Sequence, residues 1–206
     1  MIQLPHLDRR ALMGRALLLV GATMTAGMAM PVFAQSADYQ PSLDRDSFAL
    51  LGAIADTIIP RTTTGGAVDA GVPAAFDALL TNWAKPERRQ QLVAAMQEID
   101  QLARTQQGKP FVDLTAAERK TLLTPHDVES LRTLPPPPGL NGIAAMMAGP
   151  RYTNAGYGKM KELILVLYYS SELGLTQELT YVHAPGQWQP SIPVTAETRP
   201  AVGGMF

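Results

Sequence analysis

The sequence has no cysteine among its 206 residues. This absence excludes disulfide bridges, thioether-attached haem and cysteine-ligated iron–sulfur clusters in this chain. Histidine is scarce as well, with three in all, and His6 lies in a segment that we expect to be removed. The two others, His126 and His183, are far apart in the sequence and make a poor start for a zinc or haem-iron site. We therefore predict no catalytic, cofactor-binding or metal-binding residue in this chain.

The chain also has no large excess of basic or of acidic side chains. The 17 basic and 18 acidic side chains give a formal net charge of −1. Proteins that bind nucleic acids usually gather basic residues in one patch, so we expect no nucleic-acid partner. Apolar residues, in contrast, make up 46 % of the chain, which is enough for a packed core. The length suits one domain with an appendage.

The N-terminus has the order of a secretory signal. The paired Arg9 and Arg10 precede an uncharged apolar run, residues 16–33, and small side chains before Gln35 suit a signal peptidase. We predict that residues 1–34 are a cleavable twin-arginine signal, which makes the twin-arginine translocase a partner during export and the mature protein periplasmic. The alternative is a retained membrane anchor, because the run approaches the ~20 residues that span a bilayer.

The mature chain is expected to be all-α: a small helical bundle with a central apolar C-terminal helix, a Pro-rich loop and an irregular tail. Apolar residues recur at helical spacing, and capping residues and prolines mark the ends. The stretch 163–169 is apolar on every side, which is typical of a helix surrounded by others. The predicted helices run from Asp46 or Ser47 to Ile58, from Pro73 to Trp83, from Pro86 to before Gly108, from Thr115 through Leu123 with a further turn at 127–131, and from about Tyr157 to Leu173 before Gly174.

Two proline-rich segments have no helical period. Pro135–Pro138 are four consecutive prolines, and we interpret them as an extended spacer. We divide the mature chain into a helical domain, residues 35–180, and an irregular Pro-rich arm, residues 181–206. Within the arm, Tyr181 and Trp188 are the predicted contacts with a partner protein, although Trp188 could instead pack on the chain's own helices. Trp83, at helical spacing, is expected in the core.

The sequence contains no phosphate-binding loop, dinucleotide-binding glycine motif, nucleophile elbow or His-Glu-x-x-His motif. Four carboxylates sit beside apolar helix positions, where burial could shift their acidity: Asp56, Asp77, Glu162 and Glu172. A pair of them could perform general acid–base chemistry, as in glycoside hydrolysis. We favour capping, or ion pairing with Lys159 or Lys161, because nothing in the sequence marks any two as a pair.

Several stretches together resemble the gluconate 2-dehydrogenase subunit 3 family. The first half of the resemblance rests on residues 55–61, 66–73 and 76–83. The second half rests on residues 161–163, the Tyr-Tyr-Ser-Ser-Glu-Leu-Gly sequence at 168–174, and Tyr181 with Pro185-Gly186. The order and spacing of these stretches are more specific than any one of them, and they cover most of the chain after Ser47.

The resemblance implies a small subunit with a twin-arginine signal. Such proteins accompany a large FAD-containing dehydrogenase of the glucose–methanol–choline type, often with a multihaem cytochrome c subunit. Their complexes oxidise gluconate, other sugar acids, or sugars and glycosides, including glucosides at the 3-position. The family pattern implies no catalytic residue in the small subunit.

From these observations we expect a noncatalytic subunit that supports the export and stability of its flavoprotein partner. FAD would belong to that partner, haem c to a cytochrome subunit, and the complex could lie at the periplasmic face of the inner membrane. Two alternatives stay open on the sequence alone. One is a stand-alone periplasmic hydrolase that uses carboxylates, and the other is a free-standing export chaperone or interaction module.

Overall fold

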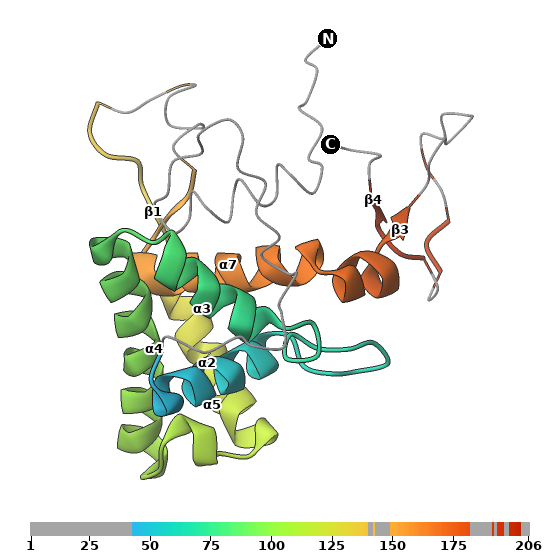
Figure 1. Ribbon diagram of the computed structural model, residues 1–206. Helices are drawn as coiled ribbons and strands as arrows, with labels where there is room; N and C mark the ends of the chain where they lie inside the picture. The colour runs from blue at the N-terminus through green and yellow to red at the C-terminus, as the bar shows by residue number, and fades with distance from the viewer. Residues whose placement is uncertain are drawn as a thin grey trace.

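The computed structural model describes residues 43–139, 142, 149–181, 191, 193–195 and 198–202. Of Tyr181, Ala201 and Val202 it describes the backbone alone. Helices dominate this part of the chain, alongside two small two-stranded sheets (Figure 1). The predicted all-α class and small helical bundle are therefore confirmed. The predicted signal with Arg9 and Arg10 lies outside the described residues, as does Trp188.

Helix α2 (Arg45–Ile58) begins earlier than predicted. Its N-cap is Asp44, and the prediction of Asp46 or Ser47 is wrong. The Asp44 carboxylate accepts hydrogen bonds from the backbone N–H groups of both of those residues, at 3.1 and 2.9 Å. These N–H groups belong to the first turn, where no intrahelical acceptor exists, so the residue that reaches both of them becomes the cap.

Prolines start the next two helices, α3 (Val72–Asn82) and α4 (Pro86–Gln107). A helix start suits proline because the N–H that proline lacks would have no partner there. Pro86 is the first residue of α4, as predicted, whereas Pro73 is the second residue of α3. Gly108 ends α4 with a φ of 69°, the left-handed conformation that glycine adopts without strain. Trp83, just after α3, is half-buried against the core.

A short 3-10 turn, η1 (Phe111–Asp113), leads into α5 (Ala116–Ser130). The predicted capping box is present, because Thr115 and Glu118 each accept a hydrogen bond from the other's backbone N–H. The predicted division of this helix after Leu123 is wrong, since α5 continues through Pro125. Proline removes one backbone hydrogen bond, to the carbonyl of Thr121, and that residue is exposed, so water can replace the missing donor.

The four-proline segment is bracketed by a small antiparallel sheet. Strand β1 (Thr133–Leu134) pairs with β2 (Arg151–Tyr152), and Pro135–Pro138 follow β1 without forming a helix. The absence of a helix at the prolines agrees with the prediction, but the pairing was not foreseen. Strands of two residues are too short to produce an alternating pattern in the sequence.

Helix α7 (Ala155–Ser170) starts two residues before the predicted position and ends three residues before it. The helix is interrupted at Ser171, whose Oγ lies 2.6 Å from the carbonyl oxygen of Tyr168 and accepts a hydrogen bond from the N–H of Gly174 at 3.0 Å. Ser171 therefore ends α7 and also caps the turns that follow.

Those turns include a five-residue π-helix, η2 (Gly174–Glu178), so the prediction that Gly174 stops the helix is wrong. Gly174 instead permits a close approach. A Cβ atom at this position would lie 2.2 Å from the carbonyl oxygen of Tyr168, a distance that no side chain tolerates.

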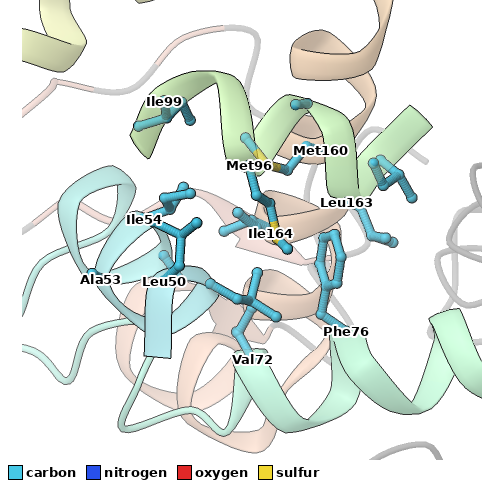
Figure 2. Close-up of a cluster of buried hydrophobic side chains, with 14 of the residues drawn as sticks. Leu50, Ala53, Ile54, Val72, Phe76, Met96, Ile99, Met160, Leu163 and Ile164 are labelled. Atoms are coloured by element: carbon cyan, nitrogen blue, oxygen red, sulfur yellow. The ribbon is translucent and has the colours of Figure 1, made fainter. Parts of the chain in front are cut away.

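The core lies where α2, α3, α4 and α7 meet. Helix α7 packs against α3 and α4, and α2 packs against the same two helices. Figure 2 shows the apolar side chains that converge between them: Leu50, Ala53, Ile54, Val72, Phe76, Met96, Ile99, Met160, Leu163 and Ile164. The central position of α7 is confirmed. Its predicted burial on every side is wrong, because Leu165 and Val166 are half-buried and Tyr169 is 38 % exposed.

The described part of the tail forms a second small sheet. Strand β3 (Thr180–Tyr181) pairs in parallel with β4 (Ala201–Val202), and the N–H of Thr180 donates to the carbonyl oxygen of Pro200 at 2.8 Å. This pairing is one ordered feature in an arm that we predicted to be irregular. Among the helices of the described residues, none has both the length and the apolarity that crossing a membrane requires.

Candidate functional site

The two halves of the family resemblance lie in contact in the folded chain. The loop between α2 and α3, residues 59–71, meets the end of α7 and η2, residues 168–178. We call this contact region the junction. More than 100 positions of sequence separate its two sides, so neither side could be recognised as the other's neighbour from the sequence.

The loop side of the junction is shaped by its own polar contacts. The N–H of Ala67 donates to the carbonyl oxygen of Ile59 at 2.9 Å, which folds the loop back on the end of α2. The carboxylate of Asp69 accepts the N–H of Gly66 at 2.8 Å and pairs with Arg61. The Gly66 N–H and then the Arg61 guanidinium hold the pKa of Asp69 below its usual value. Asp69 is therefore ionised at neutral pH and fixes the loop's shape.

The helix side joins the loop through Tyr168 and the π-helix. The Tyr168 hydroxyl lies 2.7 Å from the carbonyl oxygen of Gly65 and 3.2 Å from the Glu178 carboxylate, which also accepts a hydrogen bond from the Thr64 hydroxyl. Gln177 accepts the N–H of Gly65 at 3.0 Å. Burial, and then the nearby Glu178 charge, raise the pKa of Tyr168 to about 12, so this hydroxyl stays protonated and donates at neutral pH.

This arrangement is suited to binding and positioning. Its carboxylates already accept hydrogen bonds from the chain, and its tyrosine is held in the protonated form. The junction fixes the end of the helical domain, at Thr180, from which the arm begins. We infer that the role of the junction is to hold the surface of the loop, residues 59–71, and of the π-helix η2 in a defined shape.

Two neighbouring serines at the end of α7 give opposite predictions. The hydroxyl of Ser170 is fully buried and has no hydrogen-bond partner in the described part of the chain. Ser170→Ala should raise the stability of the mature subunit by about 1 kcal/mol, because it removes an unsatisfied buried group. Ser171→Ala should lower it by about 1–2 kcal/mol, because it removes a helix cap and two hydrogen bonds. Thermal unfolding of both variants tests the pair, and a loss of similar size in each would contradict this description.

The four carboxylates singled out from the sequence do not form a pair. Asp77 is 0 % exposed and accepts the backbone N–H of Leu43 at 3.0 Å. Asp56 lies 3.9 Å from the guanidinium of Arg119. Glu162 is half-buried, and Glu172 is exposed, so its predicted position beside the core is wrong.

The favoured interpretation of these carboxylates needs a correction for Lys161 but not for Lys159, which the Glu162 carboxylate attracts. Lys161 pairs with Asp127 at 2.6 Å, not with one of the four. The Tyr157 hydroxyl donates to the same Asp127 oxygen at 2.8 Å, and burial, followed by this carboxylate, raises the pKa of Tyr157. His126, near these residues on α5, lies 3.2 Å from the hydroxyl of Ser130 and meets the ring of Tyr157 edge-on. These contacts tie α5 to α7.

No group of three or more histidines and carboxylates that could hold a metal ion occurs among the described residues. His183, the other histidine of the mature chain, lies outside them. Of the two predicted interface residues, Tyr181 is in β3, and Trp188 also lies outside the described range. Both remain predictions as contacts with a partner.

Residues 45–186 match the family model described as gluconate 2-dehydrogenase subunit 3. No curated protein and no solved structure matches the chain. The matched range contains both sides of the junction, from the end of α2 to the π-helix, together with the whole helical core. The chain therefore belongs to the gluconate 2-dehydrogenase subunit 3 family.

Proposed function

We propose that this protein is the noncatalytic small subunit of a periplasmic dehydrogenase complex whose catalytic subunit holds FAD. The observation on which the proposal rests is the family match over residues 45–186, because this family consists of small subunits of dehydrogenase complexes. The catalytic subunit would be of the glucose–methanol–choline type and would oxidise a sugar, a sugar acid or a glucoside. Hydride transfer to FAD would be that subunit's chemistry.

The residues of this chain favour an accessory role over a hydrolytic one. Glycoside hydrolysis needs two carboxylates on either side of the bond that is cleaved. Here Asp77 is fully buried and bound to a backbone N–H, whereas Asp56 lies beside an arginine. The chain also has no cysteine for a covalently attached haem or an iron–sulfur cluster.

We further propose that the subunit escorts the flavoprotein through the twin-arginine translocase and then stays bound to it. The paired Arg9 and Arg10 support this route, which moves proteins after they have folded. In this proposal the arm at residues 181–206 contacts the partner through Tyr181 and Trp188. A cytochrome c subunit would accept the electrons from FAD and could hold the complex at the inner membrane.

Co-expression of the flavoprotein with and without this chain tests the escort role. The flavoprotein to use is the one that co-purifies with a tagged copy of this chain from the native host. We expect dye-reducing dehydrogenase activity in the periplasm only when both chains are produced. Equal periplasmic activity without this chain would contradict the proposed role in export and stability.

A further inference from the structure

A groove of about 720 Å³ runs along the outward face of the first half of α7. Strand β2 and the two residues before it border the groove on one side, and Leu131, just after α5, borders it on another. Six of the lining residues matter for its chemistry: Leu131, Tyr152 and Leu165 are apolar or aromatic, and Arg151, Lys159 and Glu162 are charged. This groove is separate from the junction, which lies at the other end of α7.

The wall of the groove is packed directly on the helix. A Cβ atom at Gly158 would lie 2.5 Å from the ring of Tyr152, so the glycine allows this ring to sit against the backbone of α7. Pairing of β2 with β1 holds Tyr152, and the guanidinium of Arg151 donates to the carbonyl oxygen of Pro135 at 2.9 Å. The groove therefore has a wall that is formed before any partner binds, which lowers the entropy lost on binding.

Lys159 is the unusual residue in this groove. It is half-buried, and no hydrogen bond or ion pair of its ammonium is found among the described residues, although the Glu162 carboxylate, three residues on, attracts it. Burial and the nearby Arg88 lower the pKa of Lys159, while Glu162 opposes this shift. Lys161, two residues on, instead binds Asp127 at 2.6 Å. The lining of the groove thus has an excess of cations, because Arg151 and Lys159 share the single carboxylate of Glu162, and burial partly desolvates Lys159.

We propose that the groove binds a segment of the catalytic subunit that places a carboxylate against Lys159 and an apolar side chain between Tyr152 and Leu165. This inference rests on the proposed function, since it names the surface through which that complex forms. Charge complementarity is the argument for the occupant. A carboxylate beside Lys159 and Arg151 would form charge-assisted hydrogen bonds in a site that the apolar walls partly shield from water. The apolar walls, in turn, require a side chain that buries surface against them.

Two substitutions at Lys159 test the assignment in the co-expressed complex. Lys159→Glu should weaken binding of the catalytic subunit by about 30-fold or more, since it places like charges together in a desolvated site. Lys159→Met keeps the length of the side chain and should weaken binding about 10-fold or more. It should leave the melting temperature of the free subunit unchanged or slightly raised, because burial penalises this cation more than the Glu162 carboxylate stabilises it. A purely structural role for Lys159 would lower that melting temperature.

The matched control is Lys120→Glu, the same charge reversal at an exposed position of α5. Lys120 is eleven residues before Leu131, or roughly 16 Å along the helix. Because of this distance from the groove, the Lys120→Glu substitution should leave binding unchanged. If the wild-type chains form a complex and both Lys159 variants bind with wild-type affinity, the groove assignment is overturned and the proposed function stands. A lowered melting temperature with unchanged affinity would also overturn it, because the groove would then be filled by the chain's own residues. Absence of any wild-type complex would contradict the proposed function itself.

Discussion

Alanine in place of Gly66 should lower the melting temperature of the mature subunit by on the order of 10 °C. A Cβ atom at this position would lie 2.6 Å from the backbone nitrogen of Arg61 and 2.8 Å from the carbonyl oxygen of Ile59. Both are backbone atoms, which cannot move aside as the end of a flexible side chain can. The loop would have to open, at a cost of roughly 3 kcal/mol, and Gly65 would lose its contact with Tyr168. Thermal unfolding followed by circular dichroism measures the effect.

Gly52→Ala is the control for this substitution. Gly52 lies inside α2, and nothing lies within 4 Å of the position that its Cβ atom would occupy. Alanine is the better helix former, so this variant should melt roughly 2 °C above the wild type. A Gly66→Ala variant as stable as the wild type would contradict the close packing described for the junction.

Replacement of Arg9 and Arg10 by lysine should keep the protein, and the flavoprotein that we propose it escorts, in the cytoplasm. The substitution keeps both positive charges. It removes the planar guanidinium groups, which present several fixed hydrogen-bond donors that an ammonium does not reproduce. We therefore expect a nearly complete loss of periplasmic material, and no other substitution should change export as strongly. Fractionation of cells followed by immunoblotting of both subunits measures it.

Arg15→Lys is the matched control, because it makes the same chemical change five residues after the pair. This variant should be exported normally. Normal export of the double variant would contradict the twin-arginine assignment and favour the general secretory route. Retention of the small subunit with normal export of the flavoprotein would instead contradict the escort role.

The helices were predictable where short-range signals mark their ends. The capping box of Thr115 and Glu118, the proline that starts α4 and Gly108 at its end all act within a few residues, so the sequence reveals them. The errors occurred where neighbouring residues compete. Asp44, Asp46 and Ser47 can each cap a helix, and only the folded chain selects Asp44. Likewise Pro125 and Gly174 are helix breakers by type, but solvent exposure and a close backbone approach let helical turns continue through both.

The junction and the groove could not be found in this way. Both depend on contacts between distant residues, such as the Tyr168 hydroxyl with Gly65 and the Tyr152 ring with Gly158. The family resemblance did include residues 66–71 on one side of the junction and Tyr168 on the other, but not Gly65 or Glu178, which the Tyr168 hydroxyl contacts. What it could not provide was the contact between the two sides, or the distinction between Lys161, which forms an ion pair with Asp127, and Lys159, for which no ion pair is found among the described residues.

Purification of the tagged subunit from the native periplasm tests the central claim most directly. The proposal predicts a yellow complex with a stoichiometric large subunit, a flavin absorption spectrum, and dye reduction with a sugar or sugar acid. Denaturation and separation of the chains should assign the flavin to the large subunit alone. A colourless monomer would contradict the proposal: glycosidase activity would then support the hydrolase, and no activity would support a free-standing module that leaves its cargo after export.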